Sequence, residues 1–232
     1  MKTFLLLPLV FTWSLAETMS INTPYRGDLY DQVKPFMVEL FDRNDYTVDF
    51  EPLPAKRGLV NANKGDDDGD GPRFNVVEKK FTNLRRVDVP ILTTSLHAYT
   101  RDPSIQVKTW KDIKPYHVGV RTGAVIHVNN VKKVNPKEVT YVASNRKLFE
   151  LLDQGKIDLL IVEKVMGRGM QKKLTLKDMK VSPALLRKNT FLYLHKKHTN
   201  KIKDFEKTLL QMKEEGYQER LRHFYETGES AW

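Results

Sequence analysis

The spacing of apolar residues divides the first part of the chain into alternating strands and helices. Residues 18–23 alternate between apolar and polar positions, and residues 29–41 carry apolar side chains at helical spacing. Residues 46–50 alternate again, and a short helix over 56–64 follows two prolines. This β-α-β-α order predicts a parallel sheet covered by helices.

A second series begins after an extended run over residues 87–99, in which Pro90 favours an irregular crossing over a central strand. Two such series joined by an extended segment predict an α/β protein of two lobes with a ligand cleft between them. The second series predicts strands at 117–120, 138–142, 157–162 and 190–194, and helices at 145–154, 200–214 and 216–226.

Residues 1–16 have the pattern of a signal peptide. Lys2 precedes twelve apolar residues, and Ser14 and Ala16 are small residues at the positions that a signal peptidase requires. Twelve apolar residues are too few to span a bilayer, which needs roughly 20. A buried N-terminal strand or helix is the alternative. We therefore expect export, cleavage near Ala16, and a periplasmic location.

Composition narrows the class of protein. The chain has no cysteine, so an exported domain must rely on an ordinary core rather than on disulfides. Its formal charge of +10 comes from scattered pairs of basic residues and not from one stripe, and no RNA-binding or helix-turn-helix pattern accompanies them. We expect the protein to be a monomer that binds neither nucleic acid nor a cofactor.

A glycine-and-aspartate segment, residues 61–73, follows the second predicted helix. Gly65 ends that helix, and an acidic turn closed by Arg73 is expected after it. Asp66, Asp68 and Asp70 occupy the first, third and fifth positions of a calcium loop, but the bidentate glutamate of position twelve is one residue late. We expect no metal here, and basic side chains or water to offset the acidic repulsion.

The order of these motifs resembles the family of extracellular solute-binding proteins that serve polar amino-acid ABC importers, family 3. The resemblance covers nearly the whole chain after residue 16. It implies a type II periplasmic-binding-protein-like fold with lobe 1 at 17–92 plus 190–232, lobe 2 at 96–185, and crossings near 92–96 and 183–190. The motifs that carry it are Asp68–Asp70, Trp110–Ile113, Gly119–Gly123, residues 148–162, and Glu215–Tyr225.

Chemistry and resemblance together indicate two charged ligand contacts. The planar fork of Arg73 matches a carboxylate, although pairing with the neighbouring aspartates is the alternative. Glu163 stands where the family usually has aspartate, at the carboxyl end of a parallel strand, and could accept an ammonium group. Its alternative is a surface carboxylate paired with Lys164 or Arg168. Asp70 departs from the family, which usually has threonine three residues before the arginine.

Four further residues complete the candidate site. Arg121 and Thr122 lie between a strand and a helix start, where free N–H groups favour anions, or they form a plain turn. Tyr25, in a loop shortened relative to the family, stacks over the ligand or serves packing. Thr94 is placed to hydrogen-bond from the crossing.

These features predict a periplasmic solute receptor that closes on a small polar ligand, zwitterionic or anionic and amino-acid-like, and delivers it to an ABC importer. The alternatives are a sensing module that signals to a membrane receptor, or a dehydratase-like enzyme on the same fold. We expect no catalytic residue, because no motif of a hydrolase occurs.

Overall fold

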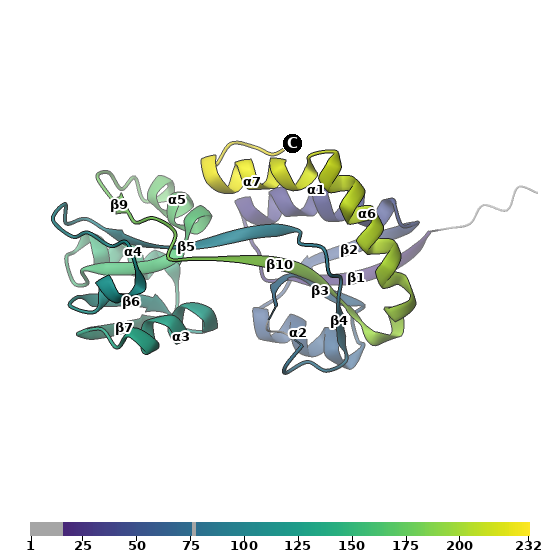
Figure 1. Cartoon of the computed structure of the whole chain (residues 1–232), viewed down its shortest axis with the longest axis horizontal. Helices are drawn as coiled ribbons and strands as arrows, with labels where there is room; N and C mark the ends of the chain where they lie inside the picture. Colours follow the sequence, from purple (N-terminus) through teal and green to yellow (C-terminus); the bar gives the residue numbers. More distant parts are fainter. Residues whose placement is uncertain (1–15, 76–77) are drawn as a thin grey trace, which may run out of the picture.

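The computed structural model describes residues 16–75 and 78–232, so the predicted signal peptide lies outside the described residues except for Ala16. Figure 1 shows two α/β lobes side by side, joined by two long strands. The strands are β1 (Glu17–Thr23), β2 (Tyr46–Pro52), β3 (Gly69–Phe74), β4 (Leu84–Arg86), β5 (Leu92–Thr100), β6 (His117–Arg121), β7 (Glu138–Val142), β8 (Leu159–Glu163), β9 (Lys180–Val181) and β10 (Leu186–His195). The α-helices are α1 (Asp28–Asp42), α2 (Ala55–Lys64), α3 (Val125–Val134), α4 (Asn145–Asp153), α5 (Lys164–Lys173), α6 (Ile202–Glu214) and α7 (Tyr217–Thr227), and two 3₁₀ helices cover Trp110–Ile113 and Lys196–Lys201.

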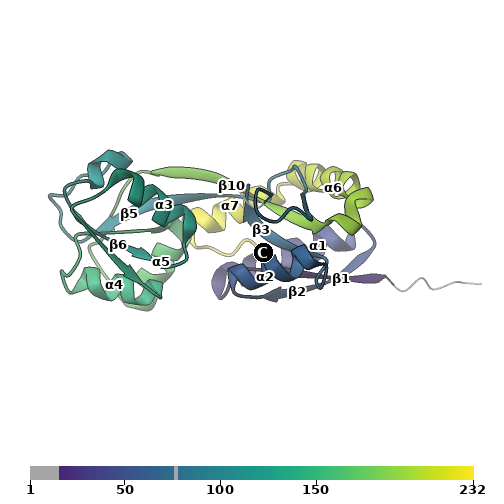
Figure 2. The same ribbon diagram turned by 90° about the horizontal axis from the view of Figure 1, so that it is seen from below.

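One mixed sheet runs through both lobes. Its strand order among the described residues is β2-β1-β3-β10-β5-β8-β6-β7, with β4 on β10 and β9 on β5. Strands β1, β2 and β3 are parallel in one lobe, and β6, β7 and β8 are parallel in the other. Between them β5 and β10 pair antiparallel, from Leu92 opposite Thr190 to Leu96 opposite Leu186. These two strands therefore connect the lobes (Figures 1 and 2).

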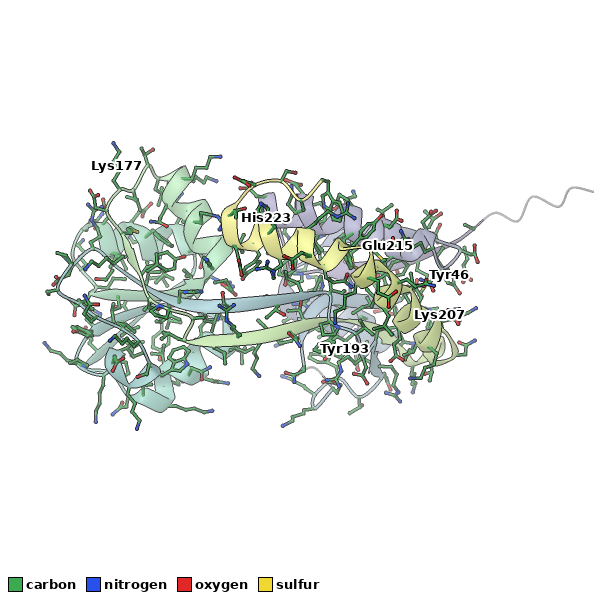
Figure 3. All side chains as sticks on the ribbon, turned by 45° about the horizontal axis from the view of Figure 1, so that its top comes forward. Tyr46, Lys177, Tyr193, Lys207, Glu215 and His223 are labelled. Atoms are coloured by element: carbon green, nitrogen blue, oxygen red, sulfur yellow. The ribbon has the colours of Figure 1, made fainter. Side chains whose placement is uncertain are left out.

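The lobe that contains both ends of the described chain, here called lobe 1, has its main core between the sheet and helices α1, α6 and α7. Apolar residues of α1 at three- and four-residue spacing are fully buried there, as the periodicity predicts. Phe205 of α6 packs edge-on against Phe41. Charged and polar side chains cover the outside of α6, α7 and the turn between them, among them Lys207, Glu215 and His223 (Figure 3).

The other lobe, lobe 2, buries apolar side chains on both faces of its sheet. Leu96, Ala98 and Ile161 face α3, whereas Tyr99 and Val162 face α4 and α5. The near-continuous apolar run of β8 follows from this two-sided burial. Helix α5 was absent from the sequence prediction, because its two glycines lower the helix propensity of a short segment.

The prediction of a turn across the whole glycine-and-aspartate segment was wrong. Gly65 does end α2 in the left-handed conformation, but residues 69–74 form β3, a buried strand between β1 and β10. A β-carbon on Gly69 would lie 2.4 Å from the carbonyl oxygen of Tyr193. Glycine here permits the close approach of two strands, which composition alone presents as a turn.

Candidate functional site

Carboxyl ends of strands from both lobes lie near the crossing, the segment in which the paired strands β5 and β10 pass from one lobe to the other. Tyr25 follows β1, Glu163 is the last residue of β8, and Arg121 is the last residue of β6. Thr94 lies on β5 between the lobes, with its side chain on the same face as Glu163, because Leu96 pairs with Glu163 and side chains two residues apart share a face. The structure thus gathers four of the six predicted residues around this crossing.

Glu163 is held by a histidine that the sequence analysis did not select. Its Oε2 lies 3.2 Å from Nε2 of His127, near the start of α3. Burial alone would raise the pKa of Glu163, but the charge interaction and hydrogen bond with His127, a backbone hydrogen bond and the charge of Arg121 outweigh it and lower that pKa to about 2. This carboxylate is therefore ionised at neutral pH. Its partner among the described residues is His127, and neither Lys164 nor Arg168 forms an ion pair with it there.

Two tyrosines from lobe 1 complete this group. Burial raises the pKa of the Tyr25 hydroxyl, and the Glu163 carboxylate adds to the rise, while Arg73 opposes it. The pKa of Tyr225, on α7, is also raised. Burial is the main cause, and the charge interactions with Glu163 and Tyr25 add to the rise. Both hydroxyls therefore stay protonated and can donate hydrogen bonds. We call Tyr25, Thr94, Arg121, His127, Glu163 and Tyr225 the junction cluster.

Two buried polar atoms of the junction cluster have no hydrogen-bond partner among the described residues. They are Nδ1 of His127 and the hydroxyl of Tyr225. The Tyr225 hydroxyl lies near Thr94 and Ser95 without meeting hydrogen-bond geometry with either. An unpaired buried polar atom costs about 1–3 kcal/mol, so such atoms indicate a place for a polar ligand or water.

Arg73 lies beside this cluster, but its fork is already engaged. Its Nε and Nη2 atoms donate to the two carboxylate oxygens of Asp70, which is fully buried, and Nη2 also donates to Ala55 O at 3.1 Å. The alternative of pairing with a neighbouring aspartate is therefore present in the structure. Within the described part of the chain only Nη1 is left without an acceptor, so a carboxylate contact by Arg73 stays a prediction.

Thr122 does not have the free backbone N–H that the sequence analysis expected. That group donates to Val142 O at 2.7 Å, because the turn after β6 continues its pairing with β7. The Thr122 side chain is exposed and takes no part in the junction cluster. A ligand contact by Thr122 therefore also stays a prediction.

Protein side chains surround the acidic residues before β3. Asp68 accepts hydrogen bonds from Ser20 N at 2.9 Å and His198 Nε2 at 2.8 Å, and it pairs with Lys197 at 2.7 Å. Asp67 accepts a hydrogen bond from Asn22 at 2.6 Å. Basic side chains thus offset the acidic repulsion at Asp68, as they do at Asp70.

Sequence reasoning missed His127 and Tyr225 for the same reason. His127 lies outside the motifs and Tyr225 only ends the last of them, and each reaches the junction because its helix packs against strands distant in sequence. In the structure, Leu221, Phe224 and Tyr225 form the buried face of α7. Nothing in the spacing of these residues indicates that the Tyr225 hydroxyl points toward Glu163.

Comparison with known proteins identifies the fold. YtmK of Bacillus subtilis, a probable amino-acid ABC transporter extracellular-binding protein, is similar with a TM-score of 0.75 and 16% identity over 92% of this chain and 99% of that one. An ancestral arginine-binding protein bound to arginine has a TM-score of 0.70 and 16% identity, over 90% and 97% of the two chains. AbpA of Streptococcus pneumoniae, an amino-acid ABC transporter substrate-binding protein bound to L-arginine, has a TM-score of 0.67 and 13% identity, over 90% and 94%.

In sequence, the chain is 25% identical to an uncharacterized protein of Shewanella oneidensis over 182 residues, which are 76% of this chain and 69% of that protein. No family model matches the chain. The protein has the two-lobed α/β fold of amino-acid ABC transporter substrate-binding proteins, and its structural neighbours are binding proteins of that class. None of the helices in residues 16–75 and 78–232 has the length and apolar character that a membrane span requires.

Proposed function

We propose that this protein is a periplasmic solute receptor of the polar amino-acid ABC importer family, which closes on a small zwitterionic or anionic ligand and delivers it to a membrane permease. The observation that carries the proposal is the junction cluster. Its polar groups come from both lobes and from β5, and two of its buried polar atoms have no hydrogen-bond partner within residues 16–75 and 78–232. A ligand bound there contacts both lobes at once, which favours the closed arrangement.

The lobes that move are residues 17–92 plus 190–232 and residues 96–185. The hydrophobic clusters support this division. Apart from Val165, one cluster unites residues up to Leu92 with residues after 190, and two others lie between residues 96 and 186. The crossings near 92–96 and 183–190 include the paired halves of β5 and β10. Bending of these strands would open and close the cleft.

Within the cleft, Glu163 accepts the ammonium group of the ligand and Arg121 attracts its carboxylate. Tyr25 and Tyr225 donate hydrogen bonds from lobe 1, and Thr94 does so from β5. Nη1 of Arg73 and the Thr122 hydroxyl are further contacts on the two sides of the cleft. His127 orients Glu163 through the Nε2 contact, and its Nδ1 is a polar contact for the ligand.

This function requires no cofactor and no chemical step. The receptor is monomeric, is exported through cleavage near Ala16, and binds a small solute and a membrane permease rather than nucleic acid. Structural neighbours that bind arginine or glutamine indicate which ligands to try first.

The test combines mass spectrometry of small molecules that co-purify with the protein and calorimetric titration with L-arginine and L-glutamine. We expect a polar solute to co-purify and Glu163→Gln to weaken its binding by about tenfold or more, the loss of one charge-assisted contact. Glu150→Gln, on the outer part of α4, is the matched control and should leave affinity unchanged. If no polar solute co-purifies and no amino acid binds, the proposed function is wrong.

A further inference from the structure

A cavity lined by polar and charged side chains lies on the face of the connecting strands opposite to Thr94 and Glu163. It has a volume of about 190 Å³ and is enclosed by β5, β10, the first residue of α5 and the last turn of α7. At about 30 Å³ per water molecule, it has room for about six waters. This cavity, here called the hinge cavity, is large enough for a phosphate ion or a short dicarboxylate.

The hinge cavity is distinct from the junction cluster, although Tyr225 borders both. Ser95 pairs with Arg187, so their side chains share one face of the β5–β10 ribbon. Thr94 and Glu163 project from the opposite face, because side chains alternate along a strand. Ser95, His97 and Arg187 line the hinge cavity, whereas Thr94 and Glu163 do not.

Positive charge dominates the wall of the hinge cavity. Three cations, Lys164, Arg187 and Arg222, face one carboxylate, Glu226. Arg222 is neutralised by that carboxylate, at 2.8 Å, and by Glu219. Lys164 and Arg187 take part in none of the ion pairs found in the described residues. Two cations that share a cavity repel each other, and an anion between them would relieve that repulsion.

The remaining wall is polar and fixed in place. His97 is buried, with Nδ1 2.8 Å from Ser182 O and Nε2 2.8 Å from Ser95 Oγ. Burial lowers the pKa of His97, and the charges of Lys164 and Arg187 lower it further. The imidazole is therefore neutral at neutral pH, and the two cations are near enough to act on it. The Ser95 hydroxyl, held by His97, adds a fixed polar group to the wall.

The cavity also joins the two lobes. Lys164 begins α5 of lobe 2, and Glu226 belongs to α7 of lobe 1. Beside it, the guanidinium of Arg168 on α5 donates to the carbonyls of Phe224 and Tyr225 at the end of α7. A change in the angle between the lobes must alter the distance between these walls.

We propose that the hinge cavity is a second ligand site, which binds a small oxyanion (a phosphate or a short dicarboxylate) between Lys164 and Arg187, and that its occupancy is coupled to the angle between the lobes. Coupling of this kind is reciprocal, so the anion would shift the balance between open and closed arrangements and be shifted by it. The proposal concerns a site separate from the cleft and does not depend on the identity of the cleft ligand.

The test is calorimetric titration of the purified protein with sodium phosphate and, separately, sodium succinate, at fixed chloride. We expect saturable binding of at least one anion, weakened by about tenfold or more in the double variant Lys164→Gln, Arg187→Gln, which loses two charge-assisted contacts. The control, Lys172→Gln with Lys173→Gln, removes the same charge from the far end of α5 and should bind as the wild type does. Equal weakening in both double variants, or no saturable binding by the wild type, would overturn the site.

Two further measurements separate this site from the cleft. Arg121→Gln should keep its phosphate and succinate affinity, and loss of binding in that variant would place the anion in the cleft instead and reject the hinge cavity. X-ray scattering should show a changed radius of gyration at a saturating anion concentration. An unchanged scattering curve despite saturable binding would reject the coupling.

Discussion

The contact between Arg168 and the end of α7 allows a quantitative test of how the lobes are held together. Arg168 donates to Phe224 O at 2.6 Å and to Tyr225 O at 3.0 Å, and also to Glu226 O. A cation at the carboxyl end of a helix also interacts favourably with the helix dipole. Hydrogen bonds from a charged donor contribute about 1.5–3 kcal/mol each, but the freed carbonyls can regain water. We therefore expect Arg168→Met to lower the free energy of unfolding by about 2–4 kcal/mol.

Gly228 provides an independent way to disturb the same contact. Its φ of 84° lies in the left-handed region, and a β-carbon there would lie 2.7 Å from Nε of Arg168. Backbone strain alone costs about 1–2 kcal/mol for alanine. Gly228→Ala must in addition displace Arg168, so we expect a total loss of about 2–4 kcal/mol. Gly216→Ala is the matched control, because Gly216 has a φ of 82° and no heavy atom within 4 Å of a β-carbon, so only the strain remains.

The assay is urea unfolding followed by circular dichroism and by tryptophan fluorescence, with coincident transitions required before free energies are compared. In the Arg168→Met background, Gly228→Ala should cost only the strain of about 1–2 kcal/mol. Strict additivity of the two substitutions would refute the shared contact. Equal losses from Gly228→Ala and Gly216→Ala would refute the predicted displacement of Arg168.

Three more substitutions test other contacts by the same unfolding assay. Gly167→Ala places a β-carbon 2.1 Å from the ring of Tyr99, so we expect overpacking to lower the free energy of unfolding by about 1–3 kcal/mol. A decrease no larger than about 0.5 kcal/mol would contradict this packing. Burial raises the pKa of Asp68, but its hydrogen bonds and a lysine charge lower it from 3.8 to about 2. About 2 kcal/mol of stability is thus present above pH 3.8 and is lost as the pH falls through about 2, and Asp68→Asn should abolish this acid dependence. Arg73→Ala leaves buried Asp70 without its cation and should cost about 3–5 kcal/mol even without ligand; an unchanged midpoint would contradict the buried pair.

The result expected for Arg73→Ala shows where local sequence information ends. The sequence shows an arginine a few residues after several aspartates. This spacing is compatible both with a contact between Arg73 and a ligand and with an ion pair inside the protein. Asp70 becomes the partner because β3 is buried between β1 and β10, and a carboxylate in that position needs a cation. Burial is a property of the whole sheet, so the residues around Arg73 cannot decide it.

The sequence by itself determined most of the elements and the two-lobed α/β class, although it missed β3 and α5. Periodicity placed α1 and β7, and glycine placed the end of α2, because helix and strand spacing and a left-handed cap depend on residues within one or two turns. It also determined that Glu163 lies at the carboxyl end of a buried strand, since nearly continuous apolar residues precede it.

Only the tertiary structure decided that Gly69–Phe74 is a central strand, that His127 is the partner of Glu163, and that the Tyr225 hydroxyl reaches the same junction. Each of these depends on contacts between segments that are far apart in the chain. Such contacts form when apolar faces of several elements are buried together, and the polar groups carried along must then find partners among whatever side chains are brought near. Local spacing fixes which face of an element is buried, but it does not fix which other element covers that face.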